Sequence, residues 1–545
     1  MLRKNDEITG LITGYTSEGR GVLRAPDGRA VFVADAIAGE IARVRIEHIG
    51  RNAAYGSIVR LEQVSPHRVD RECRLGKRCG GCDFWHMDYQ EELRLKAQRV
   101  RDALTRIGGI DPGEVSIVGA ESCCGYRNKA QYPVAPGANG PVAGFYQARS
   151  HNVLPVERCL IQSEPAGRAK DAVLEWMRRY EIPAWDEVRR RGVVRHIFVR
   201  TAATGQVFVC VVCTIRPQFG EELVEIARRA VPKLKTLVLS LHSGKGNVVL
   251  GRDMVPLWGD GRIEETLCGL RFRLSGRSFF QVNRVQAERL YELALEMAGP
   301  ARVALELYCG IGTITLCLAR QAGFVYGVEV VEDAVEDARV NAALNGVRNV
   351  EFFCADAGEA AGRFVREGVQ PEVVLVDPPR KGLGADVVDA ILRLEPQRVI
   401  YVSCDPATLA RDVARLSAGY TVAEVRAVDM FPRCSHVETV VLLSKGEINS
   451  RKVRVEFSLE DMDMSGFQKG ATYGQIKAYV LEKFGLKVSS LYISQIKRKC
   501  GLEVGDSYNQ PKSENAKVPT CPLEKERAIK AALEHFGMLE GGDHQ

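Results

Sequence analysis

The sequence predicts an α/β protein whose largest domain is a doubly wound parallel sheet of seven strands. From residue 303 onward, short apolar segments alternate with helical patterns, which is typical of parallel strands covered by helices on both faces. The last two segments have no helix between them, which predicts a closing hairpin. The expected strands are 303–307, 324–330, 349–353, 373–377, 398–403, 421–428 and 437–443.

The length and composition limit the possible classes of protein. The 545 residues are too many for one compact domain. No apolar run reaches the roughly eighteen residues of a membrane span, and the charged N-terminus has no apolar stretch behind it, so we expect no membrane segment, no secretory signal and a cytoplasmic location. The net charge of +6 permits a nucleic-acid partner without requiring one. Nothing in the sequence indicates a protein partner.

Residues 1–64 are expected to form an OB-like β-barrel. Short segments in which apolar and polar residues alternate are separated by glycine-rich turns. This pattern favours short antiparallel strands that form a closed barrel. Barrels of this kind often bind oligonucleotides, but a barrel without any ligand fits the pattern equally well.

Three further regions follow the barrel. Residues 65–285 predict a central α+β domain that begins with a cysteine run and a charged helix at 89–107. Residues 286–445 hold the doubly wound sheet. Residues 446–545 predict a helical appendage, either a helix-turn-helix or a small helical packing module, with helices near 474–481 and 491–497.

Three cysteines lie within ten residues at Cys73, Cys79 and Cys82, with two glycines in the last interval. The glycines allow backbone N–H groups to approach the sulfur atoms of a metal centre. Cys159 is a candidate fourth ligand. Four thiolates suit zinc or an iron–sulfur cluster. Three clustered cysteines and one remote cysteine favour a cubane cluster over zinc, which more often binds two close pairs.

Polar residues at successive strand ends predict an adenosyl ligand. The strand at 303–307 leads through Tyr308 into a glycine-containing turn and then to a helix that starts near Thr313. Glu329 at the tip of the next strand is suited to accept hydrogen bonds from a ribose diol. Asp356 follows the third strand, where an adenine is expected. The absence of a phosphate-binding lysine motif argues against a nucleoside phosphate.

The fourth and fifth strands end in residues with the chemistry of a reaction centre. Asp377 lies at the carboxyl edge of the sheet, and the following Arg380 and Lys381 are suited to RNA phosphates. Cys404 follows the fifth strand and precedes a helix that Asp405 is suited to cap. A thiol at a helix N-terminus is expected to have a stabilised thiolate, so Cys404 is the candidate nucleophile. A buried thiol without a reactive role is the alternative.

Several motifs together resemble the uracil-5 RNA methyltransferases, most closely the 23S rRNA branch, over roughly residues 3–445. That branch has an N-terminal TRAM barrel and a 4Fe-4S cluster. The motifs are the cysteine run with its Gly-Gly pair, SFFQVN at 278–283, DPPR at 377–380, SCDP at 403–406 and HVET at 436–439.

The resemblance implies a role for individual residues. The cluster ligands would be Cys73, Cys79, Cys82 and Cys159. S-adenosyl-L-methionine would bind through Gln281, Tyr308, Glu329 and Asp377, with Thr313 and Asp356 as further positions. Gln281 is implied by the resemblance alone, because its sequence surroundings carry no signal of their own.

The expected reaction is methylation of uracil carbon 5, a poor nucleophile. Cys404 would add to carbon 6, and a base would later remove the proton from carbon 5. Glu438 is the candidate base, and His436 is its competitor. The alternative is that Glu438 is a solvated acid at a strand start without a catalytic role. The target base would need to be unpaired or flipped out.

Two other functions remain open at this stage. The first is methylation of a uracil in transfer RNA, although relatives acting on transfer RNA usually lack both the barrel and the cluster. The second is a non-catalytic RNA-binding assembly factor on the same scaffold, which the presence of both Cys404 and Glu438 disfavours.

Overall fold

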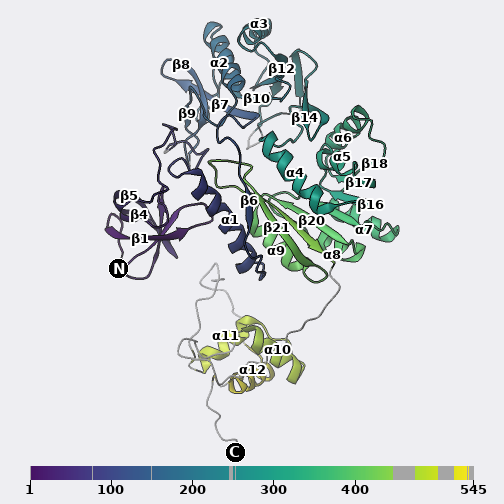
Figure 1. Ribbon diagram of the computed structural model, residues 1–545. Coiled ribbons are helices and arrows are strands. Elements are labelled where there is room, and N and C mark those ends of the chain that lie inside the picture. Colours follow the sequence, from purple (N-terminus) through teal and green to yellow (C-terminus); the bar gives the residue numbers. More distant parts are fainter. Residues whose placement is uncertain are drawn as a thin grey trace, which may run out of the picture. The chain divides into compact units, whose positions relative to one another are not determined.

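The computed structural model describes residues 2–76, 78–148, 150–244, 249–251, 253–445, 473–500, 502, 521–536 and 538 (Figure 1). The chain divides into two compact units, Met1–Asn449 and Ser450–Gln545. No helix in these described ranges has the length and apolar character needed to cross a bilayer.

The first unit begins with the expected barrel, drawn in purple in Figure 1. Its five strands close in the order β1-β2-β3-β5-β4, and their inward side chains form a separate apolar core. The strands are β1 (Glu7–Tyr15), β2 (Gly21–Arg24), β3 (Ala30–Ala34), β4 (Ile41–Ile49) and β5 (Ala53–Gln63). Residues inside β4 alternate between buried and exposed, which confirms the alternation expected for a barrel strand.

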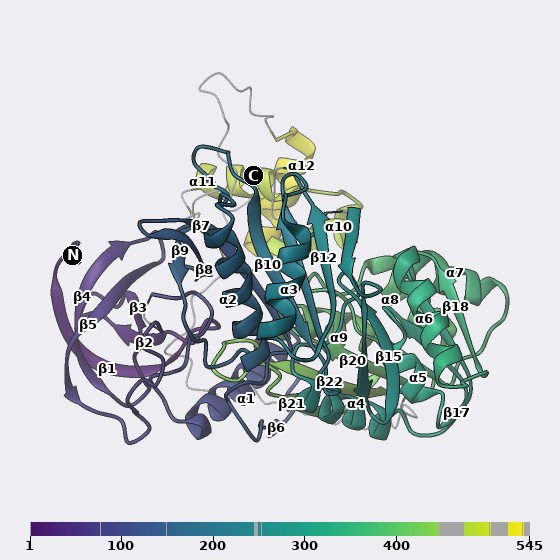
Figure 2. The same ribbon diagram turned by 90° about the horizontal axis from the view of Figure 1, so that it is seen from above.

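A seven-stranded mixed sheet follows, with strand order β13-β12-β11-β10-β7-β8-β9. Figure 2 shows it between the barrel and the second large sheet, with α2 (Glu164–Arg179) and α3 (Gly220–Ala230) in front of it. Its strands are β7 (Lys129–Gly137), β8 (Gly140–Tyr146), β9 (Val153–Pro155), β10 (Val194–Thr201), β11 (Val207–Cys213), β12 (Leu234–Leu241) and β13 (Asp253–Trp258). A hairpin of β14 (Arg262–Leu267) and β15 (Leu270–Ser275) ends this region.

The second large sheet has the order β18-β17-β16-β19-β20-β22-β21-β6. The five strands from β16 to β20 are parallel, and β22 runs antiparallel between β20 and β21, so the expected hairpin is present. The strands are β16 (Ala301–Leu307), β17 (Ala322–Glu329), β18 (Val350–Cys354), β19 (Val373–Val376), β20 (Arg398–Ser403), β21 (Thr421–Val428) and β22 (Glu438–Ser444).

This sheet differs from the expectation of seven strands because an eighth, β6 (Ser116–Val118), pairs with β21. The preceding helix α1 (Tyr89–Arg106) packs against α9 (Pro406–Leu416). The sequence places both elements in the stretch 65–285, far from their partners. A three-residue edge strand has too short a pattern to announce itself, and its pairing is set by tertiary contacts.

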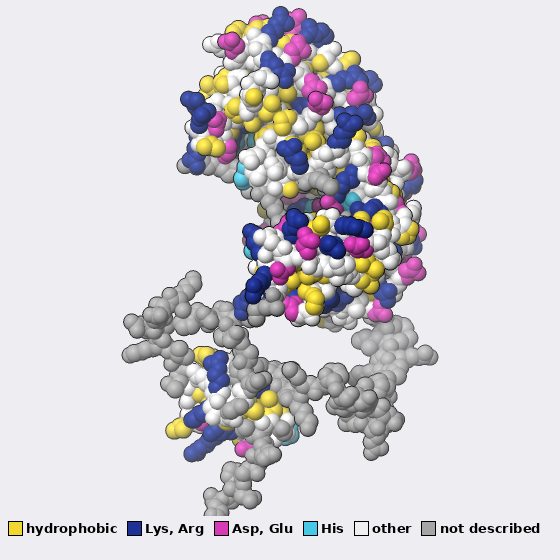
Figure 3. Space-filling view, turned by 90° about the vertical axis from the view of Figure 1, so that its left-hand side faces the viewer, with side chains coloured by type: hydrophobic (Ala, Val, Ile, Leu, Met, Phe, Trp, Pro, Cys, Tyr) yellow, Lys and Arg dark blue, Asp and Glu magenta, His cyan; other side chains and the backbone are white. Residues whose placement is uncertain are grey.

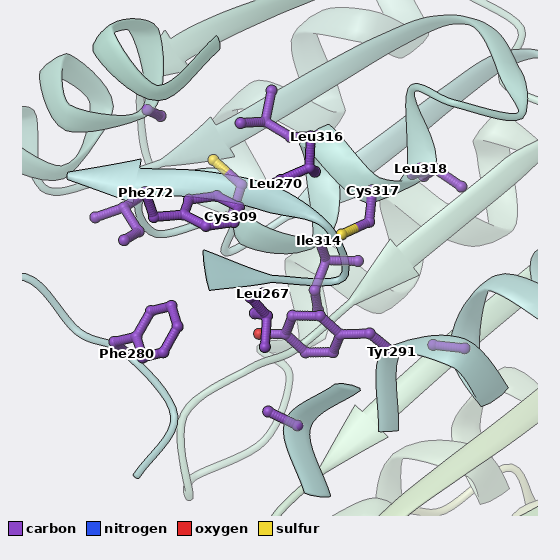
Figure 4. Packing of buried hydrophobic residues seen from close by; sticks show 14 of the residues in the cluster. Leu267, Leu270, Phe272, Phe280, Tyr291, Cys309, Ile314, Leu316, Cys317 and Leu318 are labelled. Atoms are coloured by element: carbon purple, nitrogen blue, oxygen red, sulfur yellow. The ribbon is translucent and has the colours of Figure 1, made fainter. Parts of the chain in front are cut away.

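Helices cover both faces of this sheet, as expected for a doubly wound fold. They are α4 (Arg284–Ala298), α5 (Thr313–Leu318), α6 (Glu332–Leu344), α7 (Ala357–Arg366), α8 (Ala385–Leu394) and α9. Two buried clusters lie on the two sides of the sheet. Figure 4 shows part of one cluster, in which Phe280, Tyr291 and Ile314 pack with residues of the β14–β15 hairpin. This packing fixes the loop before α4 against the sheet.

Charged side chains are mixed on the surface of the first unit. On the face drawn in Figure 3, Lys and Arg are interspersed with Asp and Glu. This distribution agrees with the mild net charge of +6.

The second unit contains three described helices, α10 (Tyr473–Phe484), α11 (Ser490–Lys499) and α12 (Leu523–His535). Their apolar faces share one small core. The sequence predicts α10 and α11 but not α12. Ser489 caps α11 by accepting a hydrogen bond from Tyr492 N at 3.2 Å.

Candidate active site

The predicted cofactor and catalytic residues meet at one edge of the second sheet. Tyr308, Glu329 and Asp377 lie at or just after the carboxyl ends of β16, β17 and β19. In the strand register Leu307 pairs with both Val328 and Val376, so these ends are level with one another. Parallel sheets place ligands in the crevice at this edge.

The turn after β16 is built for close approach of a ligand to the backbone. Tyr308, Gly310 and Gly312 all have positive φ, at 70°, 55° and 82°. A positive φ is costly for tyrosine, so the surrounding structure must hold it there. The carboxylate of Glu329 accepts hydrogen bonds from Gly310 N at 3.1 Å and from Val331 N at 2.9 Å. The turn and the acid are therefore fixed to each other.

The other predicted cofactor positions each lie next to the start of a helix. Thr313 begins α5, and its hydroxyl lies 3.1 Å from the hydroxyl of the buried Tyr291. Asp356 is exposed and caps α7 by accepting from Gly358 N at 2.9 Å. Gln281 is 8% exposed and lies just before α4, where its carbonyl accepts from Asn128 Nδ2 at 2.9 Å. Cap formation gives Asp356 a structural role in addition to any ligand contact.

Cys404 lies between the end of β20 and the start of α9. Asp405 caps this helix, as predicted, by accepting from Ala407 N at 2.8 Å and Thr408 N at 3.1 Å, and Pro406 occupies its first turn. The pairing of Ser403 with Thr439 in the β20–β22 register places Cys404 beside Glu438, the first residue of β22. Two residues 34 positions apart in sequence thus become neighbours.

The thiol of Cys404 does not have the stabilised thiolate that its helix position predicts. Burial, together with the negative charges of Glu438 and Asp377, raises its pKa to about 11, and Arg380 opposes this rise. The expectation from the helix N-terminus is wrong because it ignores the burial of the thiol and the two carboxylates that the fold brings in from other strands. In the ligand-free protein the thiol is therefore protonated.

The carboxylates next to Cys404 also have raised pKa values. Burial, together with the charge of Asp377, raises the pKa of Glu438 to about 8, and Arg380 opposes this rise. Burial raises the pKa of Asp377 to about 7. A carboxyl group with a pKa near neutrality is well matched to taking up a proton during a reaction.

His436, the competing base, has a different setting. Its ring is half-buried and meets the ring of Phe431 edge to face, with centroids 6.0 Å apart. Burial lowers its pKa, and the nearby Arg380, Arg99 and Arg127 lower it further. The histidine is therefore neutral near pH 7, and its position two residues before Glu438 keeps it at the edge of the site.

The structure adds one acid that the sequence did not single out. Glu306 is buried inside β16, where it accepts a hydrogen bond from the hydroxyl of Thr315. Burial, together with the charges of Asp377 and Glu329, raises its pKa to about 8. The strand is otherwise mostly apolar, so its sequence does not indicate that the glutamate is buried beside the site.

The four predicted metal ligands line one cavity of about 110 Å³ in the first unit. Cys73, Cys79 and Cys82 come from the loop before α1, and Cys159 comes from the loop before α2. Apolar side chains, among them Trp85 and Phe145, complete the wall. The remote cysteine thus joins the other three, as the sequence requires for a four-thiol site.

The donor set and the backbone around the cavity fit a cluster with thiolate ligands. Burial raises the pKa of Cys79, and a hydrogen bond from Gly81 N–H offsets part of this rise. Cys159 receives comparable bonds from the N–H groups of Ile161 and Gln162. Within the described residues, however, no three His, Cys, Asp or Glu side chains are spaced closely enough to form a ready-made metal site. The fit thus rests on the cavity and its donors.

Known proteins resemble most of this chain. The family model described as tRNA (uracil-5-)-methyltransferase matches residues 234–446. An RNA methyltransferase of Caldanaerobacter subterraneus is 41% identical over 439 residues, covering 80% of this chain and 97% of its own. One from Clostridium acetobutylicum is 38% identical over 452 residues, covering 82% and 98%.

One solved structure is similar over a comparable extent. It is the Pyrococcus abyssi tRNA (uracil-54, C5)-methyltransferase in complex with S-adenosyl-L-homocysteine, with a TM-score of 0.67 and 27% identity. The match covers 80% of this chain and 99% of that chain.

Proposed function

Because the chain belongs to the uracil-5 RNA methyltransferase family, we propose that it methylates carbon 5 of a uridine in 23S rRNA through a covalent bond to Cys404. The observation that carries this proposal is the juxtaposition of Cys404 and Glu438 at the ends of β20 and β22, beside Asp377. A thiol and a carboxyl group with a pKa of about 8 are the two side chains that this reaction needs.

Cys404 supplies the nucleophile. Its sulfur forms a bond to carbon 6 of the uracil, and the electrons of the C5–C6 double bond move to carbon 5 and the carbonyl at carbon 4. Because the thiol is protonated in the free protein, it must give its proton to solvent water when the substrate binds, so that the sulfur attacks as a thiolate. Asp377 and Glu438 raise the thiol pKa, and Arg380 lowers it, so neutralising either carboxylate favours the thiolate.

Glu438 supplies the base. After carbon 5 carries the methyl group, the carboxylate takes the remaining proton from carbon 5. The C5–C6 double bond then reforms, the bond between Cys404 and carbon 6 breaks, and the thiolate is released. The raised pKa of Glu438, about 8, makes its carboxylate a stronger base than an exposed glutamate. His436, with a lowered pKa, is the weaker candidate for this step.

S-adenosyl-L-methionine, when bound, supplies an electrophilic methyl group on a sulfonium centre. We assign its binding to Gln281, Tyr308, Glu329 and Asp377, with Thr313 and Asp356 at the rim. Glu329 is held at the end of β17 by Gly310 and Val331, an arrangement suited to a ribose diol. The solved relative in complex with S-adenosyl-L-homocysteine supports a ligand of this class.

Cys73, Cys79, Cys82 and Cys159 would hold a 4Fe-4S cluster, since four thiols face one cavity with backbone N–H groups near two of them. The cluster would join the loop before α1 to the loop before α2. We give it no chemical step.

The choice of 23S rRNA rests on the barrel and the cysteine run, the two features that the sequence shares with that branch of the family. A uridine in transfer RNA is the second candidate. The solved relative that acts on transfer RNA favours it, because its match covers 80% of this chain.

Incubation of the protein with 23S rRNA or transfer RNA and methyl-labelled S-adenosyl-L-methionine tests the proposal. We expect label in a uridine of 23S rRNA and none with Cys404→Ala. Cys354→Ala is the matched control, because Cys354 is an exposed thiol at the end of β18, and it should retain activity. Label only in transfer RNA would replace the substrate, and label from Cys404→Ala would reject the mechanism.

A further inference from the structure

Residues 429–437, here called the strap, join β21 to β22 and lead directly into Glu438. The mechanism assigns no residue of the strap a chemical role apart from the competitor His436. Yet the strap is held by side chains from a part of the chain more than 300 positions earlier, on α1 and the cysteine loop.

The first end of the strap is fixed in a buried ionic network. Lys96 on α1 donates to Asp429 Oδ1 and to Glu92 Oε1, both at 2.7 Å, and to the carbonyl of Phe431 at 3.2 Å. The side chains of Lys96, Glu92 and Asp429 have no solvent exposure. Glu92 also accepts from Arg433 N at 2.7 Å. Buried and mutually satisfied charges of this kind hold a unique geometry.

The middle of the strap is bonded to the cysteine loop. The carbonyl of Arg433 accepts from Asp83 N at 2.7 Å and from Phe84 N at 3.1 Å. The thiol of Cys434 donates to the carbonyl of Gly81 at 3.1 Å. Gly81 and Asp83 flank Cys82, one of the proposed cluster ligands. The cysteine loop and the strap thus form one hydrogen-bonded pair of segments.

The peptide groups of Ser435 are held from two directions. Its N–H donates to Asp83 Oδ2 at 2.8 Å, and its carbonyl accepts from Arg99 Nη1 at 2.6 Å. Both are charge-assisted hydrogen bonds, which are stronger than neutral ones. Ser435 lies three residues before Glu438, so these bonds set where the chain enters β22 and the active site.

We propose that Asp83 and Arg99 are positioning residues that hold Ser435 and thereby aim the Glu438 carboxylate at carbon 5 of the uracil. This inference rests on the proposed function. Cys404 is positioned by other bonds, those of β20 and of the Asp405 cap of α9, although α9 itself packs against α1. Loss of the Ser435 bonds therefore slows the proton-abstraction half of the reaction. Formation of the sulfur–carbon bond is not slowed, because a displaced Glu438 carboxylate repels the Cys404 thiolate less.

The expected consequence is an imbalance between the two halves of the reaction. With Asp83→Ala, the bond to carbon 6 forms and the methyl group is transferred, but removal of the carbon 5 proton slows. The methylated RNA then accumulates while still bonded to Cys404. Removing one charge-assisted hydrogen bond should slow release about tenfold.

The experiment mixes full-length protein with unmodified target RNA and S-adenosyl-L-methionine, quenches at intervals, and measures the protein–RNA adduct on a denaturing gel alongside free methylated RNA. Glu438→Gln defines maximal adduct accumulation. Asp83→Asn keeps a side-chain oxygen that accepts from Ser435 N, so it should restore release. Glu72→Ala is the control, because Glu72 is an exposed acid beside Cys73 without an ion pair or side-chain hydrogen bond in the described residues.

Arg99→Met removes the other bond to Ser435, the one to its carbonyl. Because Arg99 is on α1 and not in the cysteine loop, this variant separates the effect of positioning from any loss of iron caused by Asp83→Ala. We expect adduct to accumulate in both variants but not in Glu72→Ala. Release at the wild-type rate in both, or equal slowing of adduct formation and release, would overturn the inference. Failure of the proposed function looks different, because wild-type protein would then form no adduct even with 5-fluorouridine-containing RNA.

Discussion

Two cysteine environments in the first unit differ in what surrounds the sulfur atoms. The cavity lined by Cys73, Cys79, Cys82 and Cys159 gathers four thiols among apolar side chains. Cys404 is a single thiol between two carboxyl groups and an arginine. Burial raises the thiol pKa in both places, at Cys79 and Cys159 as at Cys404. The neighbours separate the roles: converging sulfurs suit a metal cluster, and a lone sulfur beside a base suits reversible bonding to carbon.

The largest effect should come from removing the lone sulfur. Cys404→Ser should reduce methyl transfer at least a thousandfold, because a serine hydroxyl is a much weaker nucleophile than a thiolate. Its iron content should match the wild type, since the residue is outside the four-cysteine cavity. Measuring labelled-methyl incorporation and iron content on one preparation tests both expectations. Loss of iron together with loss of activity would mean that the two cysteine environments are not independent.

A substitution in the four-cysteine cavity should change the metal content before it changes the reaction. Cys159→Ser removes the remote member of the four-thiol set, so anaerobically purified protein should lose the brown colour and the roughly four-to-four iron and sulfide of the wild type. Because Gly81 and Asp83 bond to the strap, activity should also fall, by about tenfold or more. Stoichiometric zinc in the wild type would contradict the cluster assignment.

The reaction rate should increase with pH over a range in which a thiol with a lowered pKa would already be fully deprotonated. The raised pKa values mean that Glu438 gains its base form as pH rises through about 8, and that the Cys404 thiolate fraction grows up to about 11. The single-turnover rate should therefore rise at least about tenfold between about pH 6.5 and 8.5. Glu438→Gln should make Cys404 alkylate faster with iodoacetamide at pH 8, since a repelling charge is gone. A flat profile together with unchanged alkylation would show that the carboxylates do not control the thiol.

The smallest effect is expected from the second unit. The Caldanaerobacter and Clostridium relatives match this chain over 97% and 98% of their own length, yet cover only 80% and 82% of it. Almost none of their sequence remains to match the last fifth of this chain. Truncation after residue 445 should leave single-turnover methylation within about twofold of the wild type, because every proposed catalytic and cofactor residue precedes it. A loss of tenfold or more would assign this unit a part in the reaction.

The sequence predicts the repeating parts of this molecule well. Every expected strand from 303 to 443 is present within a few residues, because an apolar strand followed by a helical pattern is a local signal. The Asp405 cap is likewise local and is confirmed. The edge strand β6 escapes because three residues carry too little pattern.

What the sequence misses depends on contacts between distant segments. The helix position of Cys404 suggested a stabilised thiolate, but burial, together with the charges of Glu438 and Asp377, reverses the sign of the pKa change. Asp83 and Arg99 meet Ser435 across 352 and 336 positions, respectively. No periodicity or spacing encodes such pairs, since they exist only once the sheets have assembled.

The most direct test of the central claim is the position of the covalent bond. RNA carrying 5-fluorouridine at the target blocks the last step, because fluorine at carbon 5 is not removed as a proton. Peptide mapping of the trapped complex by mass spectrometry should find the nucleotide on the sulfur of Cys404. A nucleotide on any other side chain, or no complex from protein that methylates ordinary RNA, would contradict the account.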